Sequence, residues 1–324
     1  SRANARKCDM PPIRSFRIAL LALVFAPIAA PAQPALWIAQ SATATNYLFG
    51  TMHALPKGTD WHFPALDRAL VASQSLYVEE DDASRAEITA LILKEGIRRP
   101  DLRNVKSMLN FHSVYPEDLA VYANPYVLSG ELAAPDREKF RAAANHADVT
   151  GGLTMVQAMK PWLAALILAN AAVRRTGFKP TFGADLELER EFRTHHKPVH
   201  AFETAQQQIA LFANTPRSVQ LEMLQAVLGD PAQRYVPVTQ LSRDWLSGNT
   251  AAIASALNGG MREHYPALYE VLVVDRNCYF AQRIAGLLNR HGTFFVAIGA
   301  AHLAGPDSVR ARLATLGITS RRVH

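Results

Sequence analysis

The stretch Thr45–His53, TNYLFGTMH, runs from an apolar, β-prone segment directly into a glycine and then a histidine. A second stretch, Thr293–His302 (TFFVAIGAAH), does the same near the other end of the chain. Apolar runs of this kind predict buried strands, and the glycine after each run lets the backbone turn sharply. Each stretch therefore predicts a strand whose end presents a histidine.

Two strand ends that each offer an imidazole can meet at one place in a folded domain. Neutral imidazoles bind divalent transition metals or transfer protons, so His53 and His302 are the first candidate site residues. The G-x-x-H pattern is weak taken alone, because short patterns arise by chance and a single histidine is usually structural. The rest of the case has to come from other parts of the chain.

Carboxylates follow two other predicted strands. Leu76–Val78 runs into a group of acids that begins with Glu79, and a strand over Lys197–Phe202 ends at Glu203. Strand ends are where α/β folds usually gather their sites. The alternatives are a solvated surface acid for Glu79 and, for Glu203, a carboxylate that stabilises the helix capped by Thr204.

The N-terminal segment predicts a secretory signal peptide. Arg14 and Arg17 precede an apolar stretch, Ile18–Ala30, which is followed by the small residues of a cleavage site near Ala32. A membrane span needs about 20 apolar residues, and Pro27 interrupts this shorter run. We therefore expect residues 1–32 to be a signal peptide with upstream residues, Met10 being a suitable start. The mature protein would be periplasmic or secreted and would keep no stable membrane anchor.

Composition favours a packed globular protein, since 49% of the 324 residues are hydrophobic and 19% are charged. Five of the 34 Lys and Arg residues and one of the 28 acids lie in residues 1–32, so the mature chain is nearly neutral. Without a clustered basic face, we expect no nucleic-acid partner. Cys278 would remain as the only cysteine, which excludes an intrachain disulfide. We interpret it as a buried inert thiol rather than a nucleophile.

Helical segments alternate with the strands and predict an α/β fold: a mixed β-sheet core with flanking helices and a large helical insert, approximately 205–290, between the two G-x-x-H strand units. Leu36–Gln40 and Thr45–Gly50 predict an N-terminal hairpin, and Gly317–Val323 an edge strand. The expected helices are Pro64–Ser73 (with Leu66, Leu70 and Val71 on one face), Ser84–Glu95, Met155–Arg175, Asp185–Thr194, several within Ala205–Ala256, Leu268–Arg290 and Pro306–Leu316. Short helices and loops are expected over Asn104–Pro135.

Other charged residues have simple structural interpretations. Arg276 lies beside the apolar run Val271–Val274, and such an arginine usually extends to solvent. Asp185 is interpreted as an acid in the first turn of a helix. The three histidines that flank Pro198 are interpreted as surface residues; they are His195, His196 and His200.

The chain resembles the TraB/PrgY/GumN family, to which the Tiki proteins also belong. The match extends over nearly all of residues 33–324, which we take as one TraB/GumN-like domain. The matching residues are Tyr47–His53; Leu76–Glu79 with Asp81; Lys160–Trp162; Gly183 and Asp185; Lys197–Val199 through Glu203–Thr204; Arg276–Asn277; and Val296–Leu303.

The resemblance implies a site built from both G-x-x-H histidines, Glu79 and Arg276. It also implies metal-dependent protease activity with Mn or Co. Glu80 departs from the family pattern, in which an apolar residue is usual. A second buried acid would raise the pKa of Glu79, but we expect Glu80 to point away along the alternating strand.

The leading hypothesis is an exported metal-dependent hydrolase, peptidase-like, with a peptide or protein substrate. His53, His302 and Glu79 would hold a divalent Mn, Co or Zn ion with an open position for water. Arg276 would stabilise the oxyanion, and Glu203 would be a general base or would orient a neighbour. One alternative is metal-free catalysis by His53 and Glu79 as a general-base pair. The other is a non-catalytic envelope protein that binds or sequesters a peptide or another ligand.

Overall fold

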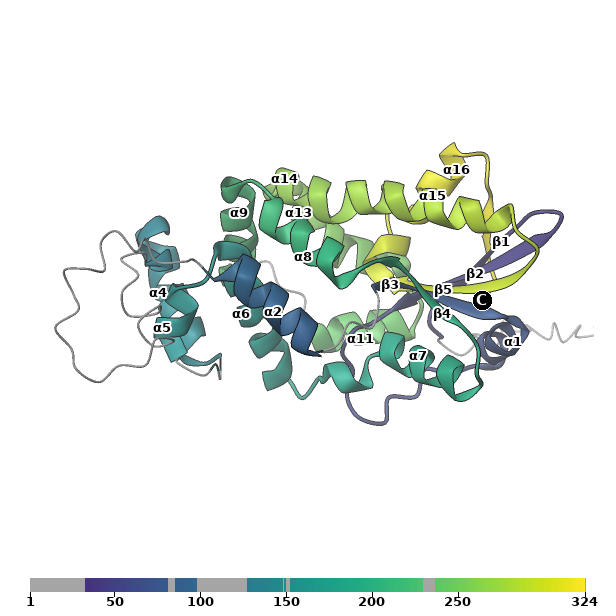
Figure 1. The fold of residues 1–324 in the computed structure, drawn as a ribbon, viewed down its shortest axis with the longest axis horizontal. Helices are drawn as coiled ribbons and strands as arrows, with labels where there is room; N and C mark the ends of the chain where they lie inside the picture. Colours follow the sequence, from purple (N-terminus) through teal and green to yellow (C-terminus); the bar gives the residue numbers. More distant parts are fainter. Residues whose placement is uncertain are drawn as a thin grey trace, which may run out of the picture. The chain divides into compact units, whose positions relative to one another are not determined.

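The strands of the described residues form one mixed sheet in the order β4-β3-β5-β2-β1-β6 (Figure 1). A computed structural model describes residues 33–80, 85–97, 127–147, 149, 152–229 and 237–323. The strands are β1 (Leu36–Gln40), β2 (Ala44–Thr51), β3 (Ser75–Glu80), β4 (Val199–Glu203), β5 (Gly292–Gly299) and β6 (Ser320–Arg322). Neighbours among β4, β3, β5 and β2 are parallel, whereas β1 is antiparallel to both β2 and β6. The predicted fold class, hairpin and edge strand are confirmed.

The two motif strands lie side by side. β2 pairs with β5 in parallel, and the register places Thr51 opposite Gly299. Parallel neighbours point their carboxyl ends the same way, so both G-x-x-H turns leave the sheet at one edge. The sheet topology thus brings together two motifs that are far apart in sequence.

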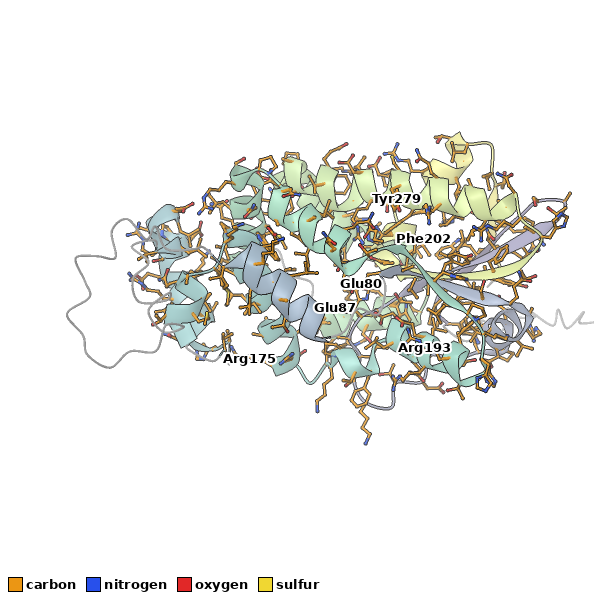
Figure 2. All side chains as sticks on the ribbon, in the orientation of Figure 1. Glu80, Glu87, Arg175, Arg193, Phe202 and Tyr279 are labelled. Atoms are coloured by element: carbon orange, nitrogen blue, oxygen red, sulfur yellow. The ribbon has the colours of Figure 1, made fainter. Side chains whose placement is uncertain are left out.

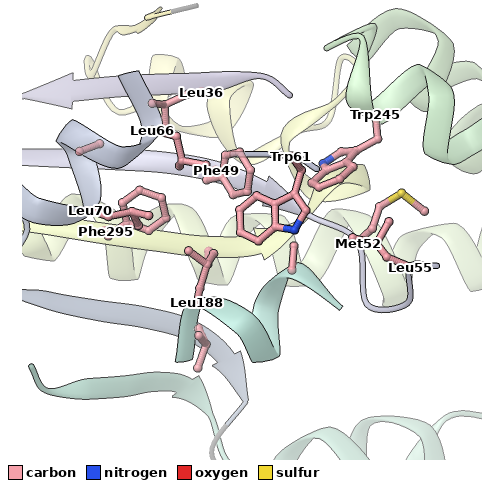
Figure 3. Close-up of a cluster of buried hydrophobic side chains, with 14 of the residues drawn as sticks. Leu36, Phe49, Met52, Leu55, Trp61, Leu66, Leu70, Leu188, Trp245 and Phe295 are labelled. Carbon is pink, nitrogen blue, oxygen red and sulfur yellow. The ribbon is translucent and has the colours of Figure 1, made fainter. Parts of the chain in front are cut away.

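Both faces of the central strands, β2, β3 and β5, are largely buried. On one face Phe49 and Phe295 pack with Leu188 and Trp245 (Figure 3); the helices there include α1 (Pro64–Ala72), α7 (Ala184–Thr194) and α11 (Val238–Leu246). On the other face Leu48 and Val296 pack against α15 (Arg276–Leu288) and α16 (Val309–Thr315). Figure 1 shows α1 and α7 on one side of the sheet and α15 and α16 on the other. Successive strand residues face opposite sides of the sheet. Strands that are buried on both faces are therefore continuous apolar runs in the sequence.

A third core lies among the helices between the two motifs. Its main elements are α4 (Ala134–Asn145), α5 (Gly152–Gln157), α6 (Pro161–Arg175), α8 (Ala205–Asn214), α9 (Arg217–Leu228) and α14 (Pro266–Tyr269). Helix α2 (Arg85–Gly96) also packs against α8. The helical region between the two motifs therefore starts well before residue 205, and β4 separates the helices up to α7 from those that begin with α8.

Two local predictions are wrong. Met155–Arg175 is not one helix, because Pro161 has no N–H to continue one and instead begins α6. Val71 is 78% exposed and does not share the buried face of Leu66 and Leu70. The predicted Leu268–Arg290 helix is present, continuous from α14 through a π-helical segment, η5 (Glu270–Asp275), to α15.

Some predictions lie outside the described residues: the signal peptide with its cleavage site near Ala32, the acids Asp81 and Asp82, and most of Asn104–Pro135. Among the helices that the structure describes, none is long and apolar enough to cross a membrane.

Candidate active site

The carboxyl ends of the four parallel strands bring the predicted site residues together. β2 and β5 lead into the turns that carry His53 and His302, while Glu79 is near the end of β3 and Glu203 ends β4. Figure 2 marks Glu80, the last residue of β3, at this edge.

His53 is oriented by the start of α7. Its Nδ1 lies 2.8 Å from Asp185 Oδ2. The amide of Ala184 donates to Met52 O (2.9 Å), and a Cβ on Gly183 would lie only 2.5 Å from His53 O, so a larger residue could not replace that glycine without movement. The His53 side chain is 64% exposed. Burial acts to lower the pKa of His53, but Asp185, Glu79 and Glu80 outweigh it and raise the pKa to about 9.

His302 is held quite differently. It lies in a 3-10 turn, η6 (Ala300–Leu303), and its side chain is 10% exposed. Its Nδ1 donates to Asn277 Oδ1 at 2.7 Å, and Asn277 Nδ2 donates to Asp307 O at 2.8 Å. This tautomer leaves Nε2 as an acceptor for Arg276 Nη1 at 3.2 Å. Burial lowers the pKa of His302 to about 4 against the opposing charge of Glu79, so the ring is neutral at neutral pH.

The turn that presents His302 has its own buttress. Asn258, which is buried, donates from Nδ2 to Ala301 O (3.0 Å) and to Ala304 O (3.1 Å). It belongs to a π-helical segment, η4 (Ala254–Gly259). π-helical turns often occur at functional sites, and here one fixes the backbone around a site histidine.

Glu79 is buried, and both of its carboxylate oxygens accept hydrogen bonds. Its Oε1 accepts from the Gly299 N–H at 2.5 Å, and its Oε2 accepts from Arg276 Nη2 at 2.8 Å. Burial acts to raise the pKa of Glu79, but His302, Arg276, His53 and the Gly299 amide together lower it to about 2. Because His302 is neutral, Arg276 is the constant positive charge beside this carboxylate.

Arg276 does not extend to solvent, so its structural interpretation was wrong. Its side chain is only 11% exposed, with the guanidinium 5.0 Å from the centre of the Phe280 ring. Besides Glu79, it donates to both oxygens of Glu203, from Nη2 (2.9 Å) and Nε (3.4 Å). Glu203 therefore fixes the guanidinium. The prediction that Thr204 caps the next helix is confirmed, since its side chain accepts from the amide of Gln207.

Glu80 does not avoid the site. It is exposed, but it lines a cavity of about 480 Å³ together with His53 and Glu79. Burial and the charge of Glu79 raise the pKa of Glu80 to about 7, against the opposing effect of His53 and Arg276. Glu80 therefore borders the cavity although it is exposed, whereas Glu79 is buried.

The side chains converge on Gly299. A Cβ built there would lie 3.1 Å from Glu79 Oε1, 3.4 Å from His53 Nε2 and 3.6 Å from His302 Cδ2. A second cavity, of about 260 Å³, is lined by these side chains and by Arg276. The missing side chain of the glycine leaves room for a ligand between the two imidazoles and the carboxylate.

The donor set fits a divalent metal, with two conditions. Metal-binding histidines usually donate their other ring N–H to a fixed acceptor, and both histidines here have one, in Asp185 and Asn277. Within the described ranges, however, no three His, Cys, Asp or Glu side chains stand ready to hold an ion. At His302 the reason is plain, because Arg276 occupies Nε2. For a metal to bind, Arg276 must turn away from His302, and His53, whose pKa is raised to about 9, must give up its proton.

Sequence reasoning missed three residues. Asp185 was interpreted as a helix acid, and neither Asn277 nor Asn258 was given a role. Asp185 and Asn277 did belong to the family pattern, which is the signal that could have found them; Asn258 had none. The histidines that flank Pro198 are exposed, as predicted. Cys278 is half-buried rather than buried.

Comparison with known proteins identifies relatives of this chain and its family. It is 22% identical over 269 residues to "Uncharacterized protein YbaP" of Escherichia coli (strain K12), a match that covers 81% of this chain and 97% of that protein. YbaP of Shigella flexneri is also 22% identical, over 271 residues, with the same coverage. No solved structure matches. The model of the TraB/PrgY/gumN family matches residues 35–322, so the chain belongs to the TraB/PrgY/gumN family.

Proposed function

We propose that this protein is an exported metal-dependent hydrolase that acts on peptides or proteins. One observation carries the proposal: two histidines, each with Nδ1 held by a fixed acceptor, converge with a buried, ionised glutamate on the cavity beside Gly299. Family membership is consistent with it but names no activity.

His53, His302 and Glu79 would hold the ion, with Mn, Co and Zn as the candidates. When bound, a divalent metal lowers the pKa of a coordinated water and polarises a substrate carbonyl. Arg276 Nη1 donates to the neutral His302 ring, whereas Nη2 and Nε donate to carboxylates. Nη1 is therefore the nitrogen of this guanidinium best placed to donate instead to a substrate oxygen. Both oxygens of Glu203 are paired with Arg276, which favours a positioning role over a general base.

Metal content tests the ligand set. Purified protein should carry close to one equivalent of a divalent metal by elemental analysis, and the double variant His53→Ala, His302→Ala should lose it. The matched control is His195→Ala, His200→Ala, which removes two exposed histidines outside the cavity. Retention of metal by the first double variant would exclude these ligands, provided that circular dichroism shows both proteins folded.

Product analysis tests the reaction. A peptide library incubated with the metal-loaded protein should give cleavage products by mass spectrometry, and chelation should stop their formation. Cleavage that survives EDTA dialysis would support the metal-free mechanism with His53 and Glu79. Peptide binding that is unchanged in Glu79→Gln, without any product, would support the sequestering function.

Export rests on the basic and apolar pattern of the first 32 residues. Expression of the full chain in a Gram-negative host should yield a periplasmic protein whose N-terminal sequence begins after Ala32. An uncleaved cytoplasmic product would contradict export without affecting the chemistry.

A further inference from the structure

Two cavities meet at the candidate active site. The cavity of about 260 Å³ and the cavity of about 480 Å³ share four lining residues: Thr51, His53, Glu79 and Gln208. Because two of these are proposed metal ligands, the cavities form two arms of one cleft with the reacting centre between them. We call them the apolar arm (about 260 Å³) and the acidic arm (about 480 Å³).

The acidic arm holds four acids against one positive charge, that of His53. Apart from Glu79, its lining includes Glu80, Asp185 and Glu189, and no lysine or arginine is among the described residues that line it. Asp185 and Glu189 are four residues apart on α7, which places them on one face of the helix. Arg193, which pairs with Glu189 at 3.0 Å, does not line the cavity. A cleft in which acids outnumber basic groups attracts a cation.

Both arms have apolar lining residues, but among the described residues the other arm has no acid besides Glu79 and also contains Arg276. Beyond the site residues, its lining is mainly apolar and includes Met52, Leu241, Trp245, Ile253 and Leu257. Leu257 is 36% exposed, which is unusual for a large apolar side chain in this fold. An apolar wall with an exposed leucine suits an apolar group of a ligand.

Two buried oxygens in the cleft lack a partner among the described residues: Thr51 Oγ1 and Asp185 Oδ1. Thr51 is only 2% exposed and lines both arms. Buried polar groups almost always have hydrogen-bond partners. A polypeptide backbone that crosses the junction would bring both N–H donors and C=O acceptors to this point.

We propose, on the basis of the hydrolase function above, that the substrate is a polypeptide segment with a positively charged side chain in the acidic arm and a large apolar side chain in the apolar arm. The scissile amide then lies between the two arms, beside His53 and Glu79. Substrate preference thus follows from the three acids, Glu80, Asp185 and Glu189, that line one arm and not the other.

The test measures peptide binding directly. The probes are short blocked alanine-based peptides with a fluorescent label; each carries one leucine and, at varied spacing, one lysine, glutamine or glutamate. Fluorescence anisotropy with the full chain should show the lysine peptide binding about fivefold more tightly than the glutamine peptide, with glutamate weakest. Serine in place of leucine should weaken binding about tenfold.

Two variants assign the arms. Glu189→Gln should remove most of the lysine preference, whereas Glu187→Gln, an exposed acid on the same helix outside both arms, should not. Leu257→Ser should remove most of the leucine preference, whereas Leu316→Ser, at a leucine 51% exposed elsewhere, should not. The peptide series on the unchanged chain carries the test even if a variant misfolds.

The outcomes separate this inference from the hydrolase proposal. Equal binding of the three charge variants, absence of binding, or control effects as large as those of Glu189→Gln and Leu257→Ser would overturn the inference. Cleavage of a peptide library without preference for basic and apolar residues would overturn it while leaving the hydrolase intact. The expected binding order without any cleavage in Mn²⁺, Co²⁺ or Zn²⁺ would support the two-armed cleft and overturn the hydrolase.

Discussion

The two G-x-x-H turns begin alike and end differently. Both follow a strand of the same sheet, and both place a histidine next to Gly299. His53 is largely exposed and faces a charged carboxylate that comes from α7, whereas His302 is buried and faces a neutral amide at the start of α15. The pKa values accordingly move in opposite directions, to about 9 for His53 and about 4 for His302.

The comparison shows that the motif fixes the position of each histidine and its partner fixes the chemistry. Strand, glycine and histidine are encoded within ten residues. The partner comes from a different helix in each case, so two copies of one motif need not do the same thing. The predictions below test this difference in order of their expected effect on the free energy of unfolding of the metal-free protein, and two of them also measure Mn²⁺ binding.

The largest effect is expected for Asn277→Leu. This change leaves His302 Nδ1–H and the Asp307 carbonyl without partners in the interior, which should lower the free energy of unfolding by about 3 kcal/mol. Asp185→Leu should cost less than about 1 kcal/mol, because water can reach the exposed His53 ring. Urea denaturation of both variants checks the pair. Equal losses would show that the two turns are supported alike.

The second effect contrasts the two glycines. A Cβ on Gly50 would lie 2.9 Å from the Ala300 Cα, so backbone would have to move. We expect Gly50→Ala to cost about 2 kcal/mol. A Cβ on Gly299 would contact side chains instead, at 3.1 Å or more.

Gly299→Ala should therefore cost less stability than Gly50→Ala but should weaken Mn²⁺ binding, because the methyl group fills the space between the ligands. Thermal unfolding and Mn²⁺ titration by calorimetry separate the two effects. If Gly299→Ala lost more stability than Gly50→Ala, the contact of Gly50 with the Ala300 backbone would not be the tighter of the two.

The sequence predicted the strand ends well and their helical partners poorly. Apolar runs and glycines are local signals, so β2, β3, β4 and β5, with His53, Glu79, Glu203 and His302 at their ends, could be placed from sequence. The docking of α7 against Met52 and His53 depends on a contact between distant segments, so the role of Asp185 could not be read from the helix that carries it. Arg276 was misjudged from its apolar neighbours for the same reason, because its carboxylate partners, Glu79 and Glu203, lie on β3 and β4, far from α15 in sequence.

A third effect concerns the buttress of the second turn. Asn258→Ala removes two hydrogen bonds to the carbonyls of Ala301 and Ala304, so we expect a loss of about 1 to 2 kcal/mol. Asn289→Ala, at an exposed asparagine after α15, is the control and should be neutral. The amide resonances of the η6 turn should broaden in the first variant only. Loss of stability without any change in that turn would mean that Asn258 acts through the packing of η4.

The smallest effect on stability is expected for Asp185→Asn. The amide oxygen can still accept from His53 Nδ1, so the free energy of unfolding should fall by less than about 1 kcal/mol. Loss of the negative charge, however, makes the ring a poorer donor to a metal, and Mn²⁺ affinity should drop at least about tenfold. Asp67→Asn provides the matched control, since Asp67 accepts from the ring of His62 at the same 2.8 Å but lies outside the cavity. If both variants weaken Mn²⁺ binding equally, the effect is one of overall charge. If neither weakens it, the Asp185 carboxylate has no part in orienting His53 for metal binding.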